Sequence, residues 1–479
     1  MIFLNAPVWT PWIITSISLG GACAAACHAL IYKRDPRSAT LWVLLIALLP
    51  FAGPLLYVLF GVNRVHRRAR RLRGTDGGDE AGSQGGRHSP AHPPPFLRGL
   101  SHLVGCVSGL PLTGGNSVRP LFGGAQAYPA MLDAIARARC SVALSSYIFD
   151  RTGVGSDFIE ALAHARQRGV QVRVLIDDVH VRLVRTSAYR ELERLGIPVA
   201  SFNPPIIPAR LYAANLRNHR KILVVDGSAG FTGGMNIQGP YRRLGAPDSG
   251  WRDLHFCMQG PVVDHLAQVF ARDWFDTTDE SLDEVFWGGQ ASPVPGGTAL
   301  ARGIEAGPDE TIDRIRWTFM GALSEARRSV RIWTPYFVPY QSLLAALGAA
   351  SLRGVEVDVL VPETGDHPVV QWASRAHYWQ VLEHGARIFE RPGPFDHTKL
   401  MIVDGHWICL GSANWDARSL RLNFEFNVEV FDTALAAALE GEFLAARAAS
   451  APVTAEAMRS RPLPVKLRDG AARLFTPVL

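Results

Sequence analysis

Two segments of the sequence carry the same polar pattern around a short apolar run. Residues 218–227 read NHRKILVVDG and residues 396–405 read DHTKLMIVDG. Each holds a histidine, a lysine two residues later and an aspartate before a glycine: His219, Lys221 and Asp226, and His397, Lys399 and Asp404. Side chains two residues apart on a β-strand point to the same face of the sheet. Each segment is therefore expected to present an imidazole and an ammonium group together.

A glycine step and an asparagine follow each segment. The first copy continues with GGMN at 233–236 and the second with GSAN at 411–414. Small residues at such a bend leave backbone N–H groups exposed, and these groups bind phosphate oxygens. The candidate phosphate-binding residues are accordingly Gly234, Asn236, Ser412 and Asn414.

Two imidazoles and two ammonium groups in one cleft suit the transfer of a phosphodiester. One histidine can attack phosphorus and form a phosphohistidine. The other can protonate the leaving oxygen and then deprotonate the incoming hydroxyl. Lysine and asparagine side chains stabilise charge on the non-bridging oxygens. This chemistry needs no metal or other cofactor, and the sequence shows no carboxylate cluster suited to a metal.

Each imidazole also needs a partner that fixes its tautomer. Asp253 lies in a strand-like run downstream of the first copy, and Glu425 lies in one downstream of the second. Proximity in sequence predicts that Asp253 pairs with His219 and that Glu425 pairs with His397. Asp396, directly before His397, is expected to raise the pKa of that imidazole by favouring its charged form.

The two motif aspartates, Asp226 and Asp404, end the apolar runs 222–225 and 400–403 at Asp-Gly turns. The runs are rich in β-branched residues and predict strands. Both aspartates belong to the repeated motif and are kept among the catalytic candidates. Their place at a turn nevertheless favours a structural role.

The two motifs belong to a longer internal repeat. The segment RCSVALSSYIFD at 139–150 resembles RRSVRIWTPYFV at 327–338, and helical patterns precede and follow each. Apolar runs that alternate with helical segments are typical of parallel β-α-β units. We therefore expect an α/β fold of two pseudo-symmetric halves, each a mixed or parallel sheet flanked by helices, over residues 98–300 and 301–450.

Two uncharged apolar runs at the N-terminus, 8–32 and 41–62, are each long enough to span a bilayer. A signal peptide fits the first run poorly, because no lysine or arginine precedes it and a second run follows at once. A two-helix transmembrane hairpin within residues 1–73 is predicted, with one span plus a re-entrant segment as the alternative. Gly20, Gly21, Ala24 and Ala25 are expected to let the two helices approach closely.

The charge of the chain favours an anionic partner. The net charge is +6 and the pI is about 9.1, which suits a phospholipid surface or a nucleic acid.

Six arginines between Arg64 and Arg73 outnumber the three basic residues of the hairpin loop, so the body is predicted to be cytoplasmic.

Two further segments are set apart by composition. Residues 74–97 are rich in glycine, serine and proline, which predicts a flexible linker. The tail at 451–479 carries a basic amphipathic segment. Such a segment either lies on an anionic bilayer or packs against the body, and the sequence leaves both open.

The two motifs resemble those of the phospholipase D superfamily. The wider match, over NHRKILVVDG, GFTGGMNI, WRDLHFCMQGP, HTKLMIVDG and GSANWDARSLRLNFEFNVEV, resembles bacterial cardiolipin synthases, as does the pair of apolar runs ahead of a basic stretch. The resemblance implies transfer of a phosphatidyl group from one phospholipid to the hydroxyl of phosphatidylglycerol at the bacterial inner membrane. Phosphatidylglycerol and phosphatidylethanolamine are the candidate donors, and an anionic membrane is the expected partner.

Three alternatives have the same motifs. A phospholipase D hydrolase would use water as the acceptor and release phosphatidic acid. A nuclease of the superfamily would bind nucleic acid, but the two apolar runs argue against a nucleic-acid partner. A non-catalytic scaffold is disfavoured because histidine, lysine and asparagine are intact in both halves.

The resemblance also bears on the two histidines, because the first motif often supplies the nucleophile in the superfamily. We therefore expect His219 to be the nucleophile and His397 the general acid and then base. The predicted carboxylates of Asp396 and Glu425 beside His397 would keep that imidazole protonated. Arg217 and Arg220 would favour a neutral His219.

Overall fold

The computed structural model describes residues 10–33, 36–58, 93–183, 186–203, 216–241 and 250–476. They belong to two compact units, an N-terminal helical unit within residues 1–68 and a body within residues 69–479. The arginine cluster Arg64–Arg73 and most of the predicted linker lie outside the described residues.

The N-terminal unit contains α1 (Thr10–Tyr32), α2 (Pro36–Leu48) and α3 (Ala52–Leu56). Among the described residues, α1 alone is long and apolar enough to cross a membrane, over Thr15–Tyr32. The second apolar run differs from the prediction, because its helix breaks at Leu49–Pro50. Proline has no N–H to donate and disfavours a helical conformation in the residue before it. The predicted continuous second span is therefore replaced by two shorter helices.

The helix contacts of this unit also differ from the prediction. The buried positions of α1 form one stripe, Ala22, Ala25 and Ala29. Of the four small residues expected at the contact, only Ala25 is buried, and the other three are exposed. The close approach lies elsewhere: a Cβ on Gly53 would stand 2.7 Å from Ile46 Cα, so a glycine is required where α3 meets α2.

The body is built on one sheet, and its strands follow the same order in both halves. From the centre outward, the first half contributes β1 (Thr113–Phe122), β8 (Leu254–Gln259), β7 (Ala229–Gly233), β6 (Ile222–Val225), β2 (Ser141–Ser146), β3 (Gln171–Asp177) and β4 (Val199–Phe202). The second half contributes β9 (Ala299–Ala306), β17 (Asn423–Phe431), β15 (Trp407–Gly411), β14 (Leu400–Val403), β10 (Ser329–Trp333), β12 (Glu356–Pro362), β13 (Arg387–Arg391) and β18 (Ala451–Val453). The antiparallel pair β1–β9 joins the halves, so the predicted pseudo-symmetric α/β fold is confirmed.

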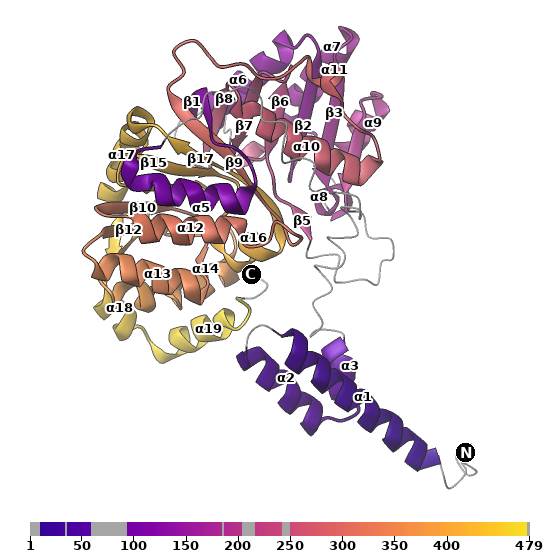
Figure 1. Ribbon diagram of the computed structural model, residues 1–479, viewed down its shortest axis with the longest axis vertical. Coiled ribbons are helices and arrows are strands. Elements are labelled where there is room, and N and C mark those ends of the chain that lie inside the picture. Colours follow the sequence, from indigo (N-terminus) through magenta and orange to yellow (C-terminus); the bar gives the residue numbers. More distant parts are fainter. Residues whose placement is uncertain are drawn as a thin grey trace. The chain divides into compact units, whose positions relative to one another are not determined.

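Helices cover the two halves in equivalent places (Figure 1). The first half has α6 (Gly123–Arg137), α7 (Val154–Gln167) and α10 (Val262–Thr278), and the second has α12 (Arg314–Glu325), α13 (Gln341–Leu352) and α17 (Thr433–Ala448). Each half has its own apolar core.

The predicted boundary of the first half at residue 98 is wrong for one helix. The helix α5 (Arg98–Ser108) lies beside α12 of the second half (Figure 1). Leu97, Leu100 and Val104 are buried in the second half's core, because the apolar side of α5 faces that half. The helix α5 therefore packs in the second half's core, although it comes before the strands of the first half in the chain.

The motif aspartates anchor the start of a neighbouring strand. The Asp404 carboxylate accepts hydrogen bonds from the N–H groups of Arg327, Arg328 and Ser329 at 2.9, 2.7 and 2.9 Å. Asp226 accepts from the N–H groups of 139–141 in the same way. Each aspartate lies at the end of its strand remote from the motif histidine. The structure thus gives both a structural role and corrects their place among the catalytic candidates.

Replacing Asp404 by alanine should destabilise the protein strongly. Three N–H groups lose one charged acceptor, and we expect the free energy of unfolding to fall by about 3 kcal/mol. Urea unfolding of the detergent-solubilised chain measures it. The matched control is Asp432→Ala, which removes an acceptor from the single N–H of Leu435 at the start of α17 and should cost about 1 kcal/mol. Equal losses would contradict the anchoring role.

Candidate active site

The two histidine segments cross from one half of the body to the other. The short strand β5 (Arg217–Asn218) pairs in parallel with the start of β17, and the His219 N–H donates to the Phe424 carbonyl at 2.9 Å. In the other copy, Asp396 bridges to Arg252, whose carbonyl accepts the His397 N–H at 2.7 Å. Each histidine is therefore fixed by the backbone of the opposite half.

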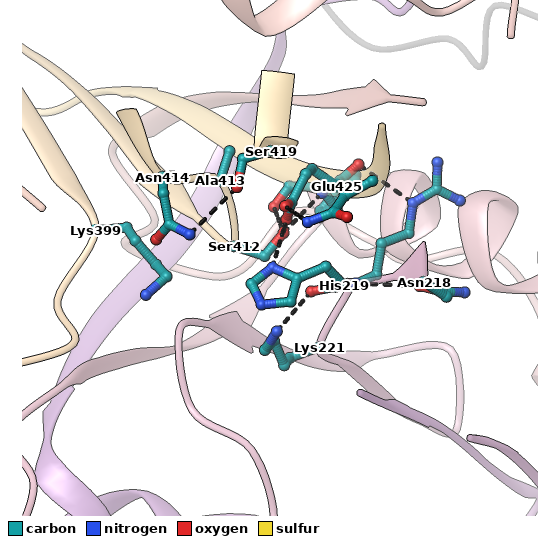
Figure 2. Close-up of polar contacts among 12 residues, drawn as sticks. Asn218, His219, Lys221, Lys399, Ser412, Ala413, Asn414, Ser419 and Glu425 are labelled. Atoms are coloured by element: carbon teal, nitrogen blue, oxygen red, sulfur yellow. Dashed lines mark hydrogen bonds and ion pairs between the residues drawn. The ribbon is translucent and has the colours of Figure 1, made fainter. Parts of the chain in front are cut away.

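This crossing exchanges the carboxylate partners. His219 Nδ1 lies 3.0 Å from Glu425 Oε2, and His397 Nδ1 lies 2.9 Å from Asp253 Oδ2. Figure 2 shows the His219 ring turned toward Glu425. The predicted pairing within each half is wrong. Each carboxylate directly follows the residue whose carbonyl accepts the other half's histidine N–H, so the register between the halves brings it to that histidine.

Gly234 and Ser412 occupy equivalent positions and support these carboxylates. Ser412 Oγ donates to Glu425 Oε2 at 2.5 Å. At Gly234 there is no room for a side chain, because a Cβ would stand 2.4 Å from Asp253 Oδ1. The bare backbone of Gly234 thus leaves room for the Asp253 carboxylate, and the Ser412 hydroxyl binds the Glu425 carboxylate. Gly234 and Ser412 lie against carboxylates, whereas the sequence predicted that they contact phosphate.

The two lysines lie beside their histidines, as the spacing predicts. Lys221 Nζ donates to the His219 carbonyl at 2.7 Å, and Lys399 Nζ donates to the His397 carbonyl at 2.6 Å. Burial lowers the pKa of Lys221 to about 7 against the opposing effect of Glu425, and it lowers the pKa of Lys399 to about 8 against that of Asp253. Both ammonium groups can therefore lose their charge close to neutral pH.

Burial also sets the protonation of the two imidazoles. It lowers the pKa of His219 to about 4, although Glu425 opposes the shift. The pKa of His397 lies well below its usual range because of burial and then the nearby positive charges of Lys399 and Lys221. The expectation that Asp396 would keep His397 charged is wrong. The Asp396 carboxylate instead pairs with Arg391 Nη1 and accepts the Thr398 N–H.

The pKa values of the two carboxylates are shifted in opposite directions. Burial acts to raise the pKa of Glu425, but His219, Lys221 and the Ser412 hydroxyl outweigh it, and the pKa is lowered. Burial raises the pKa of Asp253 well above its usual range. His219 therefore faces a carboxylate that stays ionised, whereas His397 faces one that holds its proton more readily.

Both histidines open into one cavity of about 200 Å³. Asn236 and Asn414 line the same cavity, and their predicted binding of phosphate stays a prediction. Its other lining side chains come from both halves and include Tyr147, Arg217, Gln238, Tyr241, Trp251, Tyr336, Asp366, Val370, Asp416 and Arg418.

Sequence reasoning missed the aromatic walls of this cavity. The Tyr147 ring lies 5.2 Å from the His219 ring and the Tyr336 ring 6.2 Å from the His397 ring, centroid to centroid. The two tyrosines are the ninth and tenth residues of the repeated segments 139–150 and 327–338, so the repeat places a tyrosine at nearly the same point in each half. Tyr241, whose hydroxyl lies 3.1 Å from His397 Nδ1, has no such counterpart and could not have been found this way.

The chain matches the family described as cardiolipin synthase, phospholipase D-like domain, over residues 131–274 and 319–447. Residues 22–61 match the N-terminal segment described as phospholipase D-nuclease N-terminal. A cardiolipin synthase of Geobacillus sp. strain WCH70 is 30% identical over all of this chain and 97% of its own length. The major cardiolipin synthase of Bacillus subtilis is 30% identical over 93% of this chain and 95% of its own.

A solved structure has the same fold. The phosphatidylserine synthase of Haemophilus influenzae superposes with a TM-score of 0.62 over 79% of this chain and all of its own. Its sequence is 14% identical, so the likeness concerns the arrangement of strands and helices alone.

Anion binding in the cavity should weaken as the pH rises. A lysine with a lowered pKa is charged below that pKa and neutral above it, so Lys221 and Lys399 lose charge between about pH 7 and pH 8. Sulfate keeps one charge state over that range. Its affinity, measured by calorimetry, should fall about tenfold or more between about pH 6 and pH 9. The double variant Lys221→Met/Lys399→Met should lose this pH dependence, and a retained slope would contradict the assignment.

Proposed function

We propose, on the premise that the chain belongs to the cardiolipin synthases of the phospholipase D superfamily, that it uses phosphatidylglycerol as both donor and acceptor and forms a phosphohistidine on His219. The chain is a membrane-associated phosphatidyltransferase that makes cardiolipin. The observation that supports the choice of His219 is its contact with the ionised Glu425.

In the first step, His219 Nε2 attacks the phosphorus of phosphatidylglycerol. Glu425 accepts the Nδ1–H, which fixes the tautomer with the lone pair on Nε2 and stabilises positive charge as the bond to phosphorus forms. The bond from phosphorus to the head-group oxygen breaks, and His397 donates a proton to that oxygen. Glycerol leaves, and the phosphatidyl group stays on His219.

In the second step, a hydroxyl of another phosphatidylglycerol attacks the phosphohistidine. His397 takes the proton of this hydroxyl, the phosphorus–nitrogen bond breaks and His219 is restored. Two phosphatidylglycerol molecules thus give one cardiolipin and one glycerol. Asn236 and Asn414 line the cavity and the two lysines lie beside the histidines, so these four side chains would stabilise charge on the non-bridging oxygens.

His397 takes up its proton from solvent when the substrate binds. Burial, and then the charges of Lys399 and Lys221, hold the pKa of His397 low while the cavity contains no anion. A phosphodiester between the two imidazoles brings a negative charge that offsets these cations and favours the imidazolium. The bound phosphodiester would thus keep His397 protonated, the role that the sequence suggested for the carboxylates of Asp396 and Glu425.

The direct test uses purified chain and phosphatidylglycerol labelled in the head group and in an acyl chain. Cardiolipin and glycerol should form in equal amounts. Phosphatidic acid as the main product would make the chain a hydrolase instead. Cardiolipin formed only when phosphatidylethanolamine is added would contradict phosphatidylglycerol as the donor.

The division of labour between the histidines can be tested by trapping the intermediate. With a donor whose leaving group needs no proton, such as a nitrophenyl phosphatidyl ester, His397→Asn should still form a phosphatidyl adduct on His219. His219→Asn should form none, because Nε2 of this residue is the nucleophile. Mass spectrometry of peptides identifies the modified residue. An adduct on His397 in the His219→Asn chain would reverse the assignment.

We further propose that the chain is a multi-pass protein of the inner membrane with a cytoplasmic body. The helix α1 can cross the bilayer, whereas the 13 residues of α2 cover only about 20 Å, so a return crossing needs α3 as well.

The arginines between Arg64 and Arg73 should hold the end of the return crossing in the cytoplasm. A phosphatase reporter fused after Leu479 should therefore be inactive, and a reporter that is active only in the cytoplasm should work there. Phosphatase activity at this position would place the body outside the cytoplasm.

A further inference from the structure

The C-terminal helix α19 (Leu463–Arg473) packs against α14 (Pro368–Arg375) through one of its sides. Ala472 is buried with Ala373. The Arg468 guanidinium lies 4.6 Å from the centre of the Trp372 ring. Asp469, 1% exposed, is paired with Arg461 at 2.7 Å. The sequence left open whether the tail packs on the body, and the structure shows that this side does.

The opposite side of α19 is apolar and exposed. Leu463, Leu467 and Leu474 are 67%, 65% and 78% exposed. Their spacing of four and seven residues places them in one stripe along the helix. Phe475, 57% exposed, follows directly. We call these four residues the tail face.

Positive charge surrounds the tail face. Arg459, Lys466 and Arg473 are exposed next to it, and the Lys466 ammonium donates to the Arg459 carbonyl, which holds it beside the helix. The one acidic residue of α19, Asp469, points into the body and is neutralised there by arginines. The outward surface of α19 therefore combines large apolar side chains with cations.

The helix α14, on which α19 packs, lines part of the catalytic cavity. Val370 of α14 lines the cavity and also packs in the small apolar cluster that contains Ala472 of α19. The apolar cluster beneath α19 thus extends to a side chain that lines the cavity. Val369 on α14 and Trp379 on α15 (Tyr378–Leu382) are 42% and 49% exposed. They add exposed apolar surface on α14 and on the helix that follows it.

We propose that the tail face, with Lys466 and Arg473, docks on an anionic phospholipid bilayer and so holds the cavity at the lipid head groups. Exposed apolar side chains on one side of a basic helix enter the head-group region, and each cation near an anionic surface adds about 1 kcal/mol. A bilayer fits better than a protein partner, because the cavity beside α19 must receive a head group whose acyl chains remain in the membrane. The inference rests on the proposed function.

The test compares lipid in a bilayer with lipid in solution, using the full chain reconstituted in phosphatidylcholine vesicles. One substrate is long-chain phosphatidylglycerol in the vesicles, and the other is dihexanoyl phosphatidylglycerol dissolved as monomers. The double variant Leu467→Glu/Leu474→Glu should turn over the bilayer substrate about tenfold or more slowly, since two leucines no longer enter the bilayer. It should keep the wild-type rate on the dissolved substrate, which needs no docking.

The matched control is Val285→Glu. Val285 lies on α11 (Glu284–Trp287) and is 76% exposed, and α11 lies at the other end of the body from α19 (Figure 1). This variant should behave as wild type on both substrates. Equal loss on both substrates by the double variant would show a structural role for α19 and overturn the proposal. Unchanged turnover on both, as expected if the face binds a protein, would overturn it as well.

The same assay separates this inference from the proposed function. If wild-type chain makes no cardiolipin from either form of phosphatidylglycerol, the proposed function fails. If wild-type chain makes it from both and the double variant loses neither, only the docking surface fails.

Discussion

The active site depends on two short backbone contacts between the halves of the body. The His219 N–H bonds to the Phe424 carbonyl, and the His397 N–H bonds to the Arg252 carbonyl. Because each of these carbonyls precedes a carboxylate, the same register that joins the halves also places Glu425 on His219 and Asp253 on His397. Neither half alone contains an imidazole with its orienting carboxylate. The internal repeat is therefore a requirement of the site, since each copy completes the other.

Burial is the reason to expect an anion at this site. Two imidazoles line the cavity and two ammonium groups lie beside them, and burial lowers the pKa of all four groups. Concentrated positive charge in a buried space is costly without a counter-ion. In the proposed mechanism, a phosphodiester supplies the missing negative charge. Binding of the substrate and protonation of the general acid are thus one electrostatic event in the proposed mechanism.

The two copies are not equivalent, and the difference is small and local. One carboxylate is a glutamate that accepts from Ser412, and the other is an aspartate that needs the bare backbone of Gly234 beside it. Among the residues that the structure describes, a tyrosine hydroxyl, that of Tyr241, contacts a ring nitrogen on the His397 side alone, at 3.1 Å. The fold places His219 and His397 in equivalent positions, and these local differences can give the two histidines separate roles.

Local patterns in the sequence predicted much of this structure. The β-branched runs at 222–225 and 400–403 are strands with those bounds, and the order of repeated segments gave the two halves. The same patterns failed wherever the outcome depends on contacts between distant segments. Pairing of Asp253 with His397 joins residues 144 positions apart and is set by the register between halves. The packing of α5 on the second half likewise depends on which partner the helix meets.

The crossed pairing can be measured residue by residue through the nucleophilicity of each imidazole. Diethyl pyrocarbonate acylates neutral imidazoles, and mass spectrometry of peptides gives a rate for His219 and for His397 separately. A carboxylate that accepts the Nδ1–H makes the other ring nitrogen more reactive. Glu425→Gln should therefore slow acylation of His219 and leave His397 unchanged, and Asp253→Asn should do the reverse. Slowing of His397 by Glu425→Gln, or of His219 by Asp253→Asn, would contradict a site shared between the two halves.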